Sequence, residues 1–460
     1  MTQHLNQQQG GVMLAERNAR QERTVLEERV ARILEIARAG GADAAEVAVS
    51  RSEGLAVSVR HGEVETVEQT RDQGFGITVY WGRRKGSAST SDSSVEAVEA
   101  TVAKAMNIAR FTAEDPAAGL ADAELMPRGP LPELDLYHPW DIDVAKAAEL
   151  ARACEAAALG FDERMTNSDG ASTTSGRSCR AYGNSHGFIG SELATRHGLS
   201  VAVIAGRDSG MQRDYAFTVD RAAAGLEAAE DVGRRAGERT VARLGARPVP
   251  TARMPVLFSH DVAAGLLGHF VTAISGGSLY RRASFLLDSL GQQIFPERVQ
   301  IEELPHLPRA LGSAAFDSDG VATRRKSLVE GGVLSSYLLS AYSARRLGLV
   351  TTANAGGVHN LRISDDGLDL PALMARLGRG LLVTELMGQG VNGVTGDYSR
   401  GAAGFWVENG EISHPVQEVT VAGNLKDMFR NLDAIGSDIE RPGNIVCGSL
   451  LIDGMTISGS

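Results

Sequence analysis

The sequence predicts an α+β protein in which helices flank antiparallel sheet modules and a large glycine-rich antiparallel β domain follows them. Segments with helical periodicity and segments that alternate like strands occur in separate blocks. A doubly wound parallel fold would instead interleave them, so that class is disfavoured. A chain of 460 residues with 43% hydrophobic residues is too long for one core, and we expect two or three domains.

The first element is an N-terminal tail, 1–21, which is polar and glutamine-rich and is predicted to be disordered. Residues 22–111 then form an N-terminal α+β module. Its first helix ends at Gly40-Gly41, alternating strands fill 44–90, and a capping box at Ser93 and Glu96 opens a second helix. The turns expected between its strands are Glu53-Gly54, His61-Gly62 and Asp72-Gln73-Gly74.

Proline-rich residues 112–140 are predicted to be a linker, and residues 141–246 a middle α+β module with the same helix, sheet, helix order. Residues 247–460 are rich in glycine and in strand patterns, and we expect a C-terminal β-rich domain there. It contains two clear hairpin signals, Glu330-Gly331-Gly332 and Glu408-Asn409-Gly410-Glu411, the second with the Asn-Gly pair that favours a type I′ turn.

Composition excludes several functional classes. The net charge of −11 is spread out and no basic stripe interleaves with aromatic residues, so nucleic acid is not an expected ligand. No stretch of about 18 apolar residues occurs, and the N-terminus lacks the apolar core of a secretion signal. We therefore expect a cytoplasmic protein with no membrane contact. Three scattered cysteines, Cys154, Cys179 and Cys447, fit reduced, packed thiols.

Two motifs that suggest hydrolases have simpler interpretations. Residues 183–187, GNSHG, match the G-x-S-x-G nucleophile elbow, but that motif needs a helix after it and strand-like sequence follows here, so we predict a hairpin turn. The glycines at 388, 390, 393 and 396 lack the lysine and the helix of a phosphate-binding loop, and we predict tight turns.

Histidines raise the possibility of a metal site. His260 and His269 fall on one predicted helix, about 180° apart around it and about 13 Å apart along it, so they cannot share one ion. Asp261 is positioned to cap that helix. His359 lies in the glycine-rich stretch AGGVHN, where it either lines a cavity as a ligand or base or serves only as a hydrogen-bonding residue.

Long segments of the chain resemble one known family. GLLGHFVTAISGGSLYRRASFLLDSLGQQIFP, TTANAGGVHN, VTELMGQGVNGVTGDYSRGAAGFWVENGEI and VAGNLKDMFRNLDAIGSDIE are similar to the PmbA/TldE branch of the TldD/PmbA metallopeptidase family. The resemblance runs from about residue 24 to the end and is densest after residue 255. It implies the same α+β fold and a place in a peptidase complex.

In that family, the TldD-type subunit has an HExxxH helix that binds zinc, a glutamate base within the motif, and a cysteine ligand near the C-terminus. The resemblance places His269 at the first histidine, whereas Phe270 replaces the glutamate and Ile274 replaces the second histidine. The family's cysteine falls nearer Gly436-Ser437, where this chain has Asp438, whereas Cys447 falls inside the last predicted strand, NIVCGSLLI, so Cys447 is not its counterpart. Phenylalanine and isoleucine supply neither a base nor a zinc ligand. We therefore expect no cofactor and no catalytic residue in this chain.

The resemblance implies a heterodimer with a TldD-type HExxxH subunit that carries the zinc and degrades unfolded or short peptides in an enclosed cavity. This chain would form part of the cavity wall. The residues expected at the cavity or partner surface are His359, Asn360, Tyr398, Arg400 and Trp406, since arginine and aromatic side chains concentrate at interfaces. The opposite interpretation, in which Phe405 and Trp406 belong to the core, is equally open.

Two other functions stay open. The chain could hydrolyse peptides alone through an unrecognised metal set such as His260, His269 and His359. It could also be a regulatory protein-binding subunit, in keeping with the older description of the family as a modulator of DNA gyrase.

Overall fold

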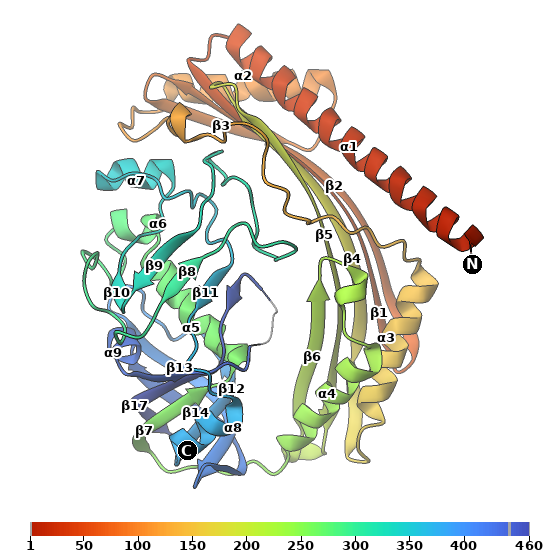
Figure 1. Ribbon diagram of the computed structural model, residues 1–460, viewed down its shortest axis with the longest axis vertical. Coiled ribbons are helices and arrows are strands. Elements are labelled where there is room, and N and C mark those ends of the chain that lie inside the picture. Colours follow the sequence, from red (N-terminus) through yellow and green to blue (C-terminus); the bar gives the residue numbers. More distant parts are fainter. Residues whose placement is uncertain (1, 440–442, 460) are drawn as a thin grey trace.

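The computed structural model describes residues 2–439 and 443–459, with the backbone but not the side chains given for 2–19 and Ser209. A long, curved sheet forms one half of the molecule (Figure 1), and helices cover its outer face while the C-terminal domain lies across its inner face. The strand order is β3-β2-β1-β4-β5-β6, with every neighbouring pair antiparallel.

The strands of this sheet are long. They are β1 (Ala44–Arg60), β2 (Glu63–Trp81), β3 (Arg84–Thr90), β4 (Met165–Asn184), β5 (Ile189–Ala205) and β6 (Gln212–Asp220). Of the three predicted turns in the first module, only His61-Gly62 is one, with positive φ angles at both residues. Gly54 and Gly74 instead lie within continuous strands. Glycine serves at position 54 because a Cβ there would meet the Thr70 hydroxyl at 2.8 Å.

The two α+β modules share this one sheet, because β1 pairs with β4 along almost its whole length. The first module contributes the helices α1 (Thr2–Ala39) and α2 (Val95–Phe111), and the middle module contributes α3 (Val144–Leu159) and α4 (Ala229–Ala242). Two separate cores form between helices and sheet. One packs Val30 and Val102 against β1 and β2, and the other packs Ala151 and Val232 against β4 and β5.

Two predicted helix starts need correction. Helix α2 is capped by Ser94, whose hydroxyl accepts from the Ala97 N–H, and not by Ser93. In the middle module, which we predicted to open with a helix near residue 141, helix α3 begins at Val144 and is capped by Asp143. Helix α1 begins at Thr2, well before the predicted position, but the side chains of residues 2–19 are outside the described part. The expectation of disorder over 1–21 therefore stays a prediction.

The linker is irregular, as expected, apart from the short 3-10 helix η1 (Ala123–Leu125). It is not a solvated spacer. Met126, Leu134 and Leu136 are buried in small clusters that join the large sheet to the C-terminal domain, and Leu120 packs against Tyr80 of the large sheet. The linker therefore packs as part of both halves of the molecule.

The C-terminal domain contains two further sheets. Its larger sheet is built from β7 (Ala252–Phe258), β12 (Gly380–Met387), β13 (Asp397–Glu408), β14 (Glu411–Asn424), β15 (Leu432–Ile435) and β17 (Leu450–Ser458). Because β14 pairs with both β13 and β17, five of these strands close on themselves. The smaller sheet contains β8 (Ile301–Glu303), β9 (Lys326–Glu330), β10 (Val333–Leu334), β11 (Leu361–Ile363) and β16 (Ile445–Val446).

Both predicted hairpins of this domain are confirmed. Strands β9 and β10 meet at Gly331-Gly332, and β13 and β14 meet at Asn409-Gly410, all four residues having positive φ. The helices are α5 (His260–Ala273), α6 (Gly276–Tyr280), α7 (Ala341–Leu347), α8 (Leu370–Leu377) and α9 (Leu425–Arg430). Two 3-10 turns, η2 (Asp208–Gly210) and η3 (Ala223–Gly225), complete the described elements.

The observed architecture is α+β, as predicted. No helix among the described residues combines the length and apolar character needed to cross a bilayer.

Candidate functional site

Helix α5 carries the positions that the resemblance singled out. It begins after Ser259, so Ser259 and not Asp261 is the N-cap residue, and Asp261 in the first turn forms an ion pair with Arg239 of α4 at 3.0 Å. Leu266, Leu267 and Phe270 face the core of the C-terminal domain. The helix is therefore held by apolar packing along one side and by α4 at its start.

His269 is half-buried against an aromatic ring. Its imidazole meets the edge of the Tyr398 ring, with centroids 6.0 Å apart. Burial lowers the pKa of His269, and the positive charge of Arg400 lowers it further, so the ring is neutral at physiological pH. This side chain is a packed, uncharged histidine.

The two positions that a zinc motif would need are filled by core residues. Phe270 is completely buried, with its ring 5.5 Å from that of Phe295 and 6.2 Å from that of Phe429. Ile274, also completely buried, is the residue that ends the helix, and its N–H donates to the Phe270 carbonyl. These residues do not fit a zinc ion, because neither offers an electron pair or a base.

The N-terminus of α5 meets the segment where the family's cysteine would fall. The carboxylate of Asp438 accepts from the N–H of Ser449 at 2.8 Å and from its hydroxyl at 2.6 Å, and the Ser449 hydroxyl accepts from the N–H of His260. Cys447 lies in the loop between β16 and β17, not inside the last strand as we expected. Burial raises the pKa of its thiol to about 12, so Cys447 is an inert, protonated side chain.

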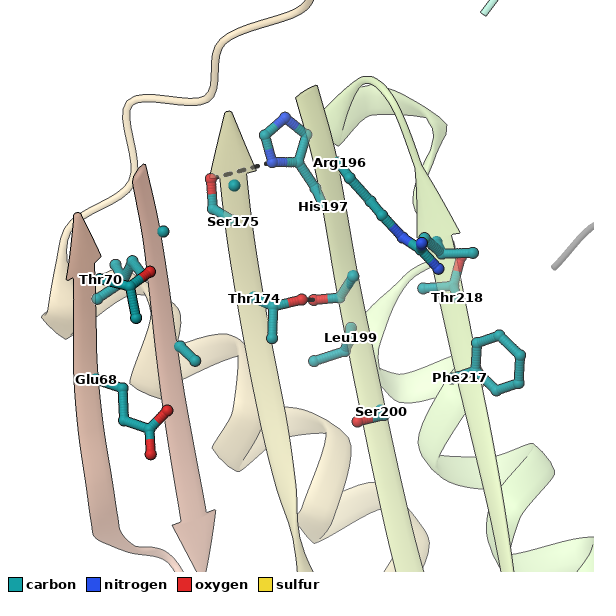
Figure 2. A pocket seen from close by; sticks show the side chains of 16 residues that line it. Glu68, Thr70, Thr174, Ser175, Arg196, His197, Leu199, Ser200, Phe217 and Thr218 are labelled. Carbon is teal, nitrogen blue, oxygen red and sulfur yellow. Dashed lines mark hydrogen bonds between the residues drawn. The ribbon is translucent and has the colours of Figure 1, made fainter. Parts of the chain in front are cut away.

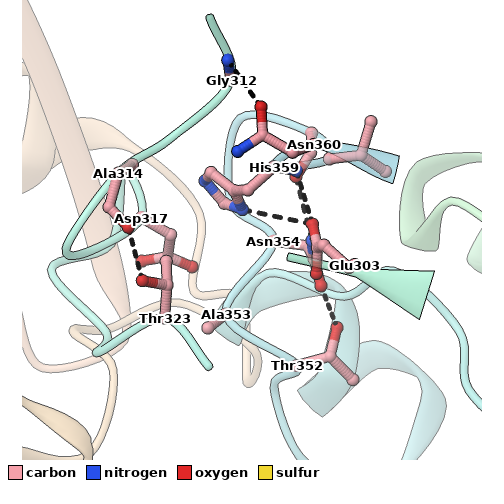
Figure 3. A network of polar contacts seen from close by, with 12 residues as sticks. Glu303, Gly312, Ala314, Asp317, Thr323, Thr352, Ala353, Asn354, His359 and Asn360 are labelled. Carbon is pink, nitrogen blue, oxygen red and sulfur yellow. Dashed lines mark hydrogen bonds and ion pairs between the residues drawn. The ribbon is translucent and has the colours of Figure 1, made fainter. Parts of the chain in front are cut away.

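His359 belongs to a different, polar region of the domain (Figure 3). The carboxylate of Glu303, fully buried on β8, accepts from the N–H of His359 at 2.6 Å and from Nδ2 of Asn354 at 2.8 Å, and His359 Nδ1 lies 3.2 Å from it. The ammonium of Lys326 lies 2.8 Å from the other carboxylate oxygen. We call Glu303, Lys326, Asn354 and His359 the Glu303 network.

The positive charge and the hydrogen bonds around Glu303 offset the cost of burying its carboxylate. Burial raises the pKa of Glu303, but the hydrogen bond from His359 and the positive charge of Lys326 outweigh it and hold the pKa below its usual value. Lys326 also donates to the Thr352 carbonyl. The network therefore ties the loop 351–360 to the small sheet, and hydrogen bonding accounts for His359.

Asn360 has the same kind of role. It is buried with φ of 50°, donates to the Leu304 carbonyl and the Ser313 hydroxyl, and accepts from the Gly312 N–H. Asparagine tolerates this left-handed conformation better than most residues. The side chain joins two loops and does not face a free surface.

Two of the residues expected at a surface are core residues. Tyr398 is 1% exposed and Trp406 is 3% exposed, and both point into the closed sheet with Ala402. The prediction that they form a partner or cavity surface is wrong. Arg400, on the same strand, is half-buried and donates to the carbonyls of Leu386 and Met387. Trp406 donates to Glu408, which accommodates its polar N–H.

The serine of the G-x-S-x-G match lies in a turn, as predicted. Strands β4 and β5 are antiparallel neighbours joined by residues 185–188, and the Ser185 hydroxyl accepts from the Ala45 N–H at 3.0 Å. No helix follows it, so Ser185 does not stand on a nucleophile elbow.

A feature that sequence reasoning missed lies on the inner face of the large sheet (Figure 2). A groove with a volume of about 490 Å³ crosses β2, β1, β4, β5 and β6. Its floor has three glycines, Gly54, Gly176 and Gly198, and its walls include Glu68, Thr70, Thr174, Arg196 and Phe217. We call it the strand groove. A second hollow of about 780 Å³ lies between the sheet and the loop 316–318.

The strand groove could have been suspected from its residues. Over residues 50–58 of β1 and 168–178 of β4, the even-numbered positions carry only serine, glycine, alanine and threonine, whereas the alternate positions include the valines and alanines that face the helices. We interpreted Gly54 as part of a turn because a single strand pattern does not show which strand lies beside it.

The described part of the chain holds no cluster of three or more histidine, cysteine, aspartate or glutamate side chains suited to a metal ion. The suggested set of His260, His269 and His359 is not assembled: His269 packs on Tyr398, and His359 pairs with Glu303.

Comparison with known proteins agrees with this architecture. Three family models match consecutive parts of the chain: PmbA/TldA metallopeptidase domain 1 over residues 45–109, the central domain over 137–244, and the C-terminal domain over 251–459. The chain is 52% identical to Metalloprotease PmbA of Escherichia coli O157:H7, over 95% of this chain and 97% of that protein. It is 49% identical to the Metalloprotease PmbA homolog of Haemophilus influenzae, over 95% of this chain and 96% of that protein.

Solved structures share the fold. A proposed modulator of DNA gyrase from Bacteroides thetaiotaomicron superposes with a TM-score of 0.89 at 29% identity, covering 94% of this chain and 98% of that one. TldE from Thermococcus kodakarensis superposes with a TM-score of 0.82 at 20% identity, covering 93% of this chain and 99% of that one.

Proposed function

We propose, starting from the fact that the chain belongs to the PmbA/TldD metallopeptidase family, that it is the subunit without zinc in a two-chain cytoplasmic peptidase. In this proposal, a separate TldD-type chain with an intact HExxxH helix holds the zinc and the base. This chain supplies part of the wall of the compartment in which unfolded or short peptides are degraded.

Phe270 carries the proposal. A zinc peptidase needs a proton acceptor within hydrogen-bond reach of the metal-bound water. At that position this chain has a fully buried ring that contacts Phe295 and Phe429. The ring is part of the packing of the domain, so the position contributes to folding and not to proton transfer.

The strand groove supports the role in substrate binding. A groove that runs across several strands and has a glycine floor lets an extended chain approach the sheet closely. Its lining mixes Glu68, Arg196 and the apolar Phe217, so it does not select one side chain type. That suits peptides of varied sequence.

Metal analysis tests the proposal. The purified full chain is expected to hold far less than one zinc per molecule and to leave an unfolded protein such as reduced, denatured casein intact. Mixed with a TldD-type chain from the same genome, it should form a stable complex that cleaves casein and loses activity on chelation. One tightly held zinc per isolated chain, with casein cleavage that chelation abolishes, would show instead a peptidase that acts alone.

A regulatory role is the second candidate, because the Bacteroides thetaiotaomicron relative carries the description of a proposed DNA gyrase modulator. Co-purification separates the two. A stoichiometric partner with an HExxxH helix supports the peptidase subunit, and a stable partner without one supports the regulatory role.

A further inference from the structure

The helix layer over the large sheet has a gap between its two cores. On β4, Cys179 and Ala181 point into the core under α1 and α2, and Ala171 points into the core under α3. Side chains two residues apart in a strand point to the same face. Ser175 therefore lies on the helix-covered face, midway between the two cores, and the linker crosses over it.

The neighbour of Ser175 in the sheet is His197 on β5. The Ser175 hydroxyl lies 3.0 Å from Nδ1 of His197, and Nε2 of the same ring lies 2.9 Å from the carbonyl oxygen of His138 in the linker. Figure 2 shows the serine and the imidazole turned toward each other. The ring is also held by the edge of Trp140, with centroids 5.3 Å apart.

These contacts assign the protons. A carbonyl oxygen only accepts hydrogen bonds, so Nε2 carries a hydrogen. Burial lowers the pKa of His197. The hydrogen bond to His138 and the charge of Asp220 raise the pKa, but burial outweighs them, so the ring is neutral. Nδ1 then has a free electron pair, and the Ser175 O–H must donate to it. A serine that donates to a neutral imidazole held by a third group has the arrangement of an activated nucleophile.

Ser175 is half-buried and opens into a cavity. The cavity has a volume of about 610 Å³ and lies between the sheet and the linker. Leu55, Trp140 and Ile142 form an apolar wall, and Arg177, two residues along β4 on the same face, brings a guanidinium to its lining. A small acyl group fits against the apolar wall, while the Arg177 guanidinium is paired with the carboxylate of Glu53 in the same lining.

We propose that Ser175 and His197 form a second reactive site, in which Ser175 attacks activated esters of short apolar acids. The Ser175 oxygen forms a bond to the acyl carbon, and the bond from that carbon to the alcohol oxygen breaks. The proton of the hydroxyl moves to Nδ1 of His197 and then to the departing alcohol. Water hydrolyses the acyl-serine by the reverse proton movements. The site needs no metal and is independent of the proposed peptidase role.

A fluorophosphonate tests this site in the full chain, because its P–F bond takes the place of the ester bond and the serine stays labelled. Ser175 is expected to be labelled about 100-fold faster than Ser178, a serine exposed on the opposite face of the same strand. Peptide mass spectrometry locates the label. Ser175→Ala should remove it, and Ser178→Ala should leave it unchanged.

His197→Asn should slow labelling of Ser175 about 100-fold while a thermal melt confirms folding. The proposal would be overturned if Ser175 in the unaltered chain is labelled no faster than Ser178. It would also be overturned if folded His197→Asn is labelled at Ser175 as fast as the unaltered chain. If His197→Asn does not fold, the ratio of Ser175 to Ser178 labelling in the unaltered chain decides alone.

Discussion

Helix α5 and the Glu303 network lie in the same domain and each contains a histidine, but they are stabilised in opposite ways. Around Phe270 the helix is packed by rings, and the histidine beside it is neutral. Around Glu303 a buried carboxylate collects an ammonium, an amide and a histidine. The first region tolerates no charge, and the second depends on one. A histidine in sequence therefore says little until its neighbours are known.

The largest expected effect comes from placing a charge in the apolar region. Phe270→Glu, which introduces the glutamate that the resemblance would place here, should lower the free energy of unfolding by more than about 4 kcal/mol, because the carboxylate has no buried partner. Denaturant unfolding measures the change. Thr272→Glu, on the exposed side of the same helix, should shift stability by less than about 0.5 kcal/mol. A stable Phe270→Glu chain would mean that the position is not core.

Removing the charge from the polar region should be nearly as costly. Glu303→Gln leaves Lys326 buried without its anion, and we expect a loss of about 3–5 kcal/mol in the free energy of unfolding. The matched control is Glu302→Gln on the same strand. That residue pairs with the exposed Arg325, and its loss should cost no more than about 1 kcal/mol. Equal effects of the two substitutions would contradict the difference between buried and exposed pairs.

A pH titration sharpens the comparison at Asp317, which lies beside the Glu303 network. Burial raises the pKa of Asp317 to about 6, above its usual 3.8, although three backbone N–H groups donate to it. The folded state holds the proton longer, so the contribution of Asp317 to stability is full below about pH 4 and is lost as the pH rises through about 6.

Thermal unfolding between pH 4 and 7 measures this contribution. The unaltered chain should lose stability relative to Asp317→Asn as the pH rises across that window. Parallel curves for the two proteins would show that Asp317 titrates normally.

The smallest effect is expected at Tyr398. Its hydroxyl is buried without a hydrogen-bond partner among the described residues, so Tyr398→Phe should change the free energy of unfolding by no more than about 0.5 kcal/mol or should stabilise the chain. Tyr182→Phe is the control. It removes a hydroxyl that bonds Glu46 at 3.0 Å and the Asp319 carbonyl, and it should cost about 1–3 kcal/mol. A large loss on Tyr398→Phe would reveal a partner for that hydroxyl.

The two serines of β4 and its turn show where sequence reasoning ends. Ser185 matches a hydrolase motif, and the missing helix after it was enough to predict a turn correctly. Ser175 matches no motif. Its partner His197 comes 22 residues later, and a third group, the His138 carbonyl, lies in the linker. Only the register of β4 against β5 and the path of the linker bring these groups together.

The sequence alone determined the α+β class, the hairpins at Gly331-Gly332 and Asn409-Gly410, and side chains at Phe270 and Ile274 that offer neither a base nor a metal ligand. Those features depend on local backbone preferences and on side-chain chemistry, which are properties of single residues. The tertiary structure alone decided that two modules share one sheet, that Tyr398 and Trp406 are buried, and that Ser175 faces His197. Each of these three features depends on which strands are neighbours in a sheet and on which segment covers each face of that sheet. Alternation within one strand defines two faces but does not say which of them meets solvent.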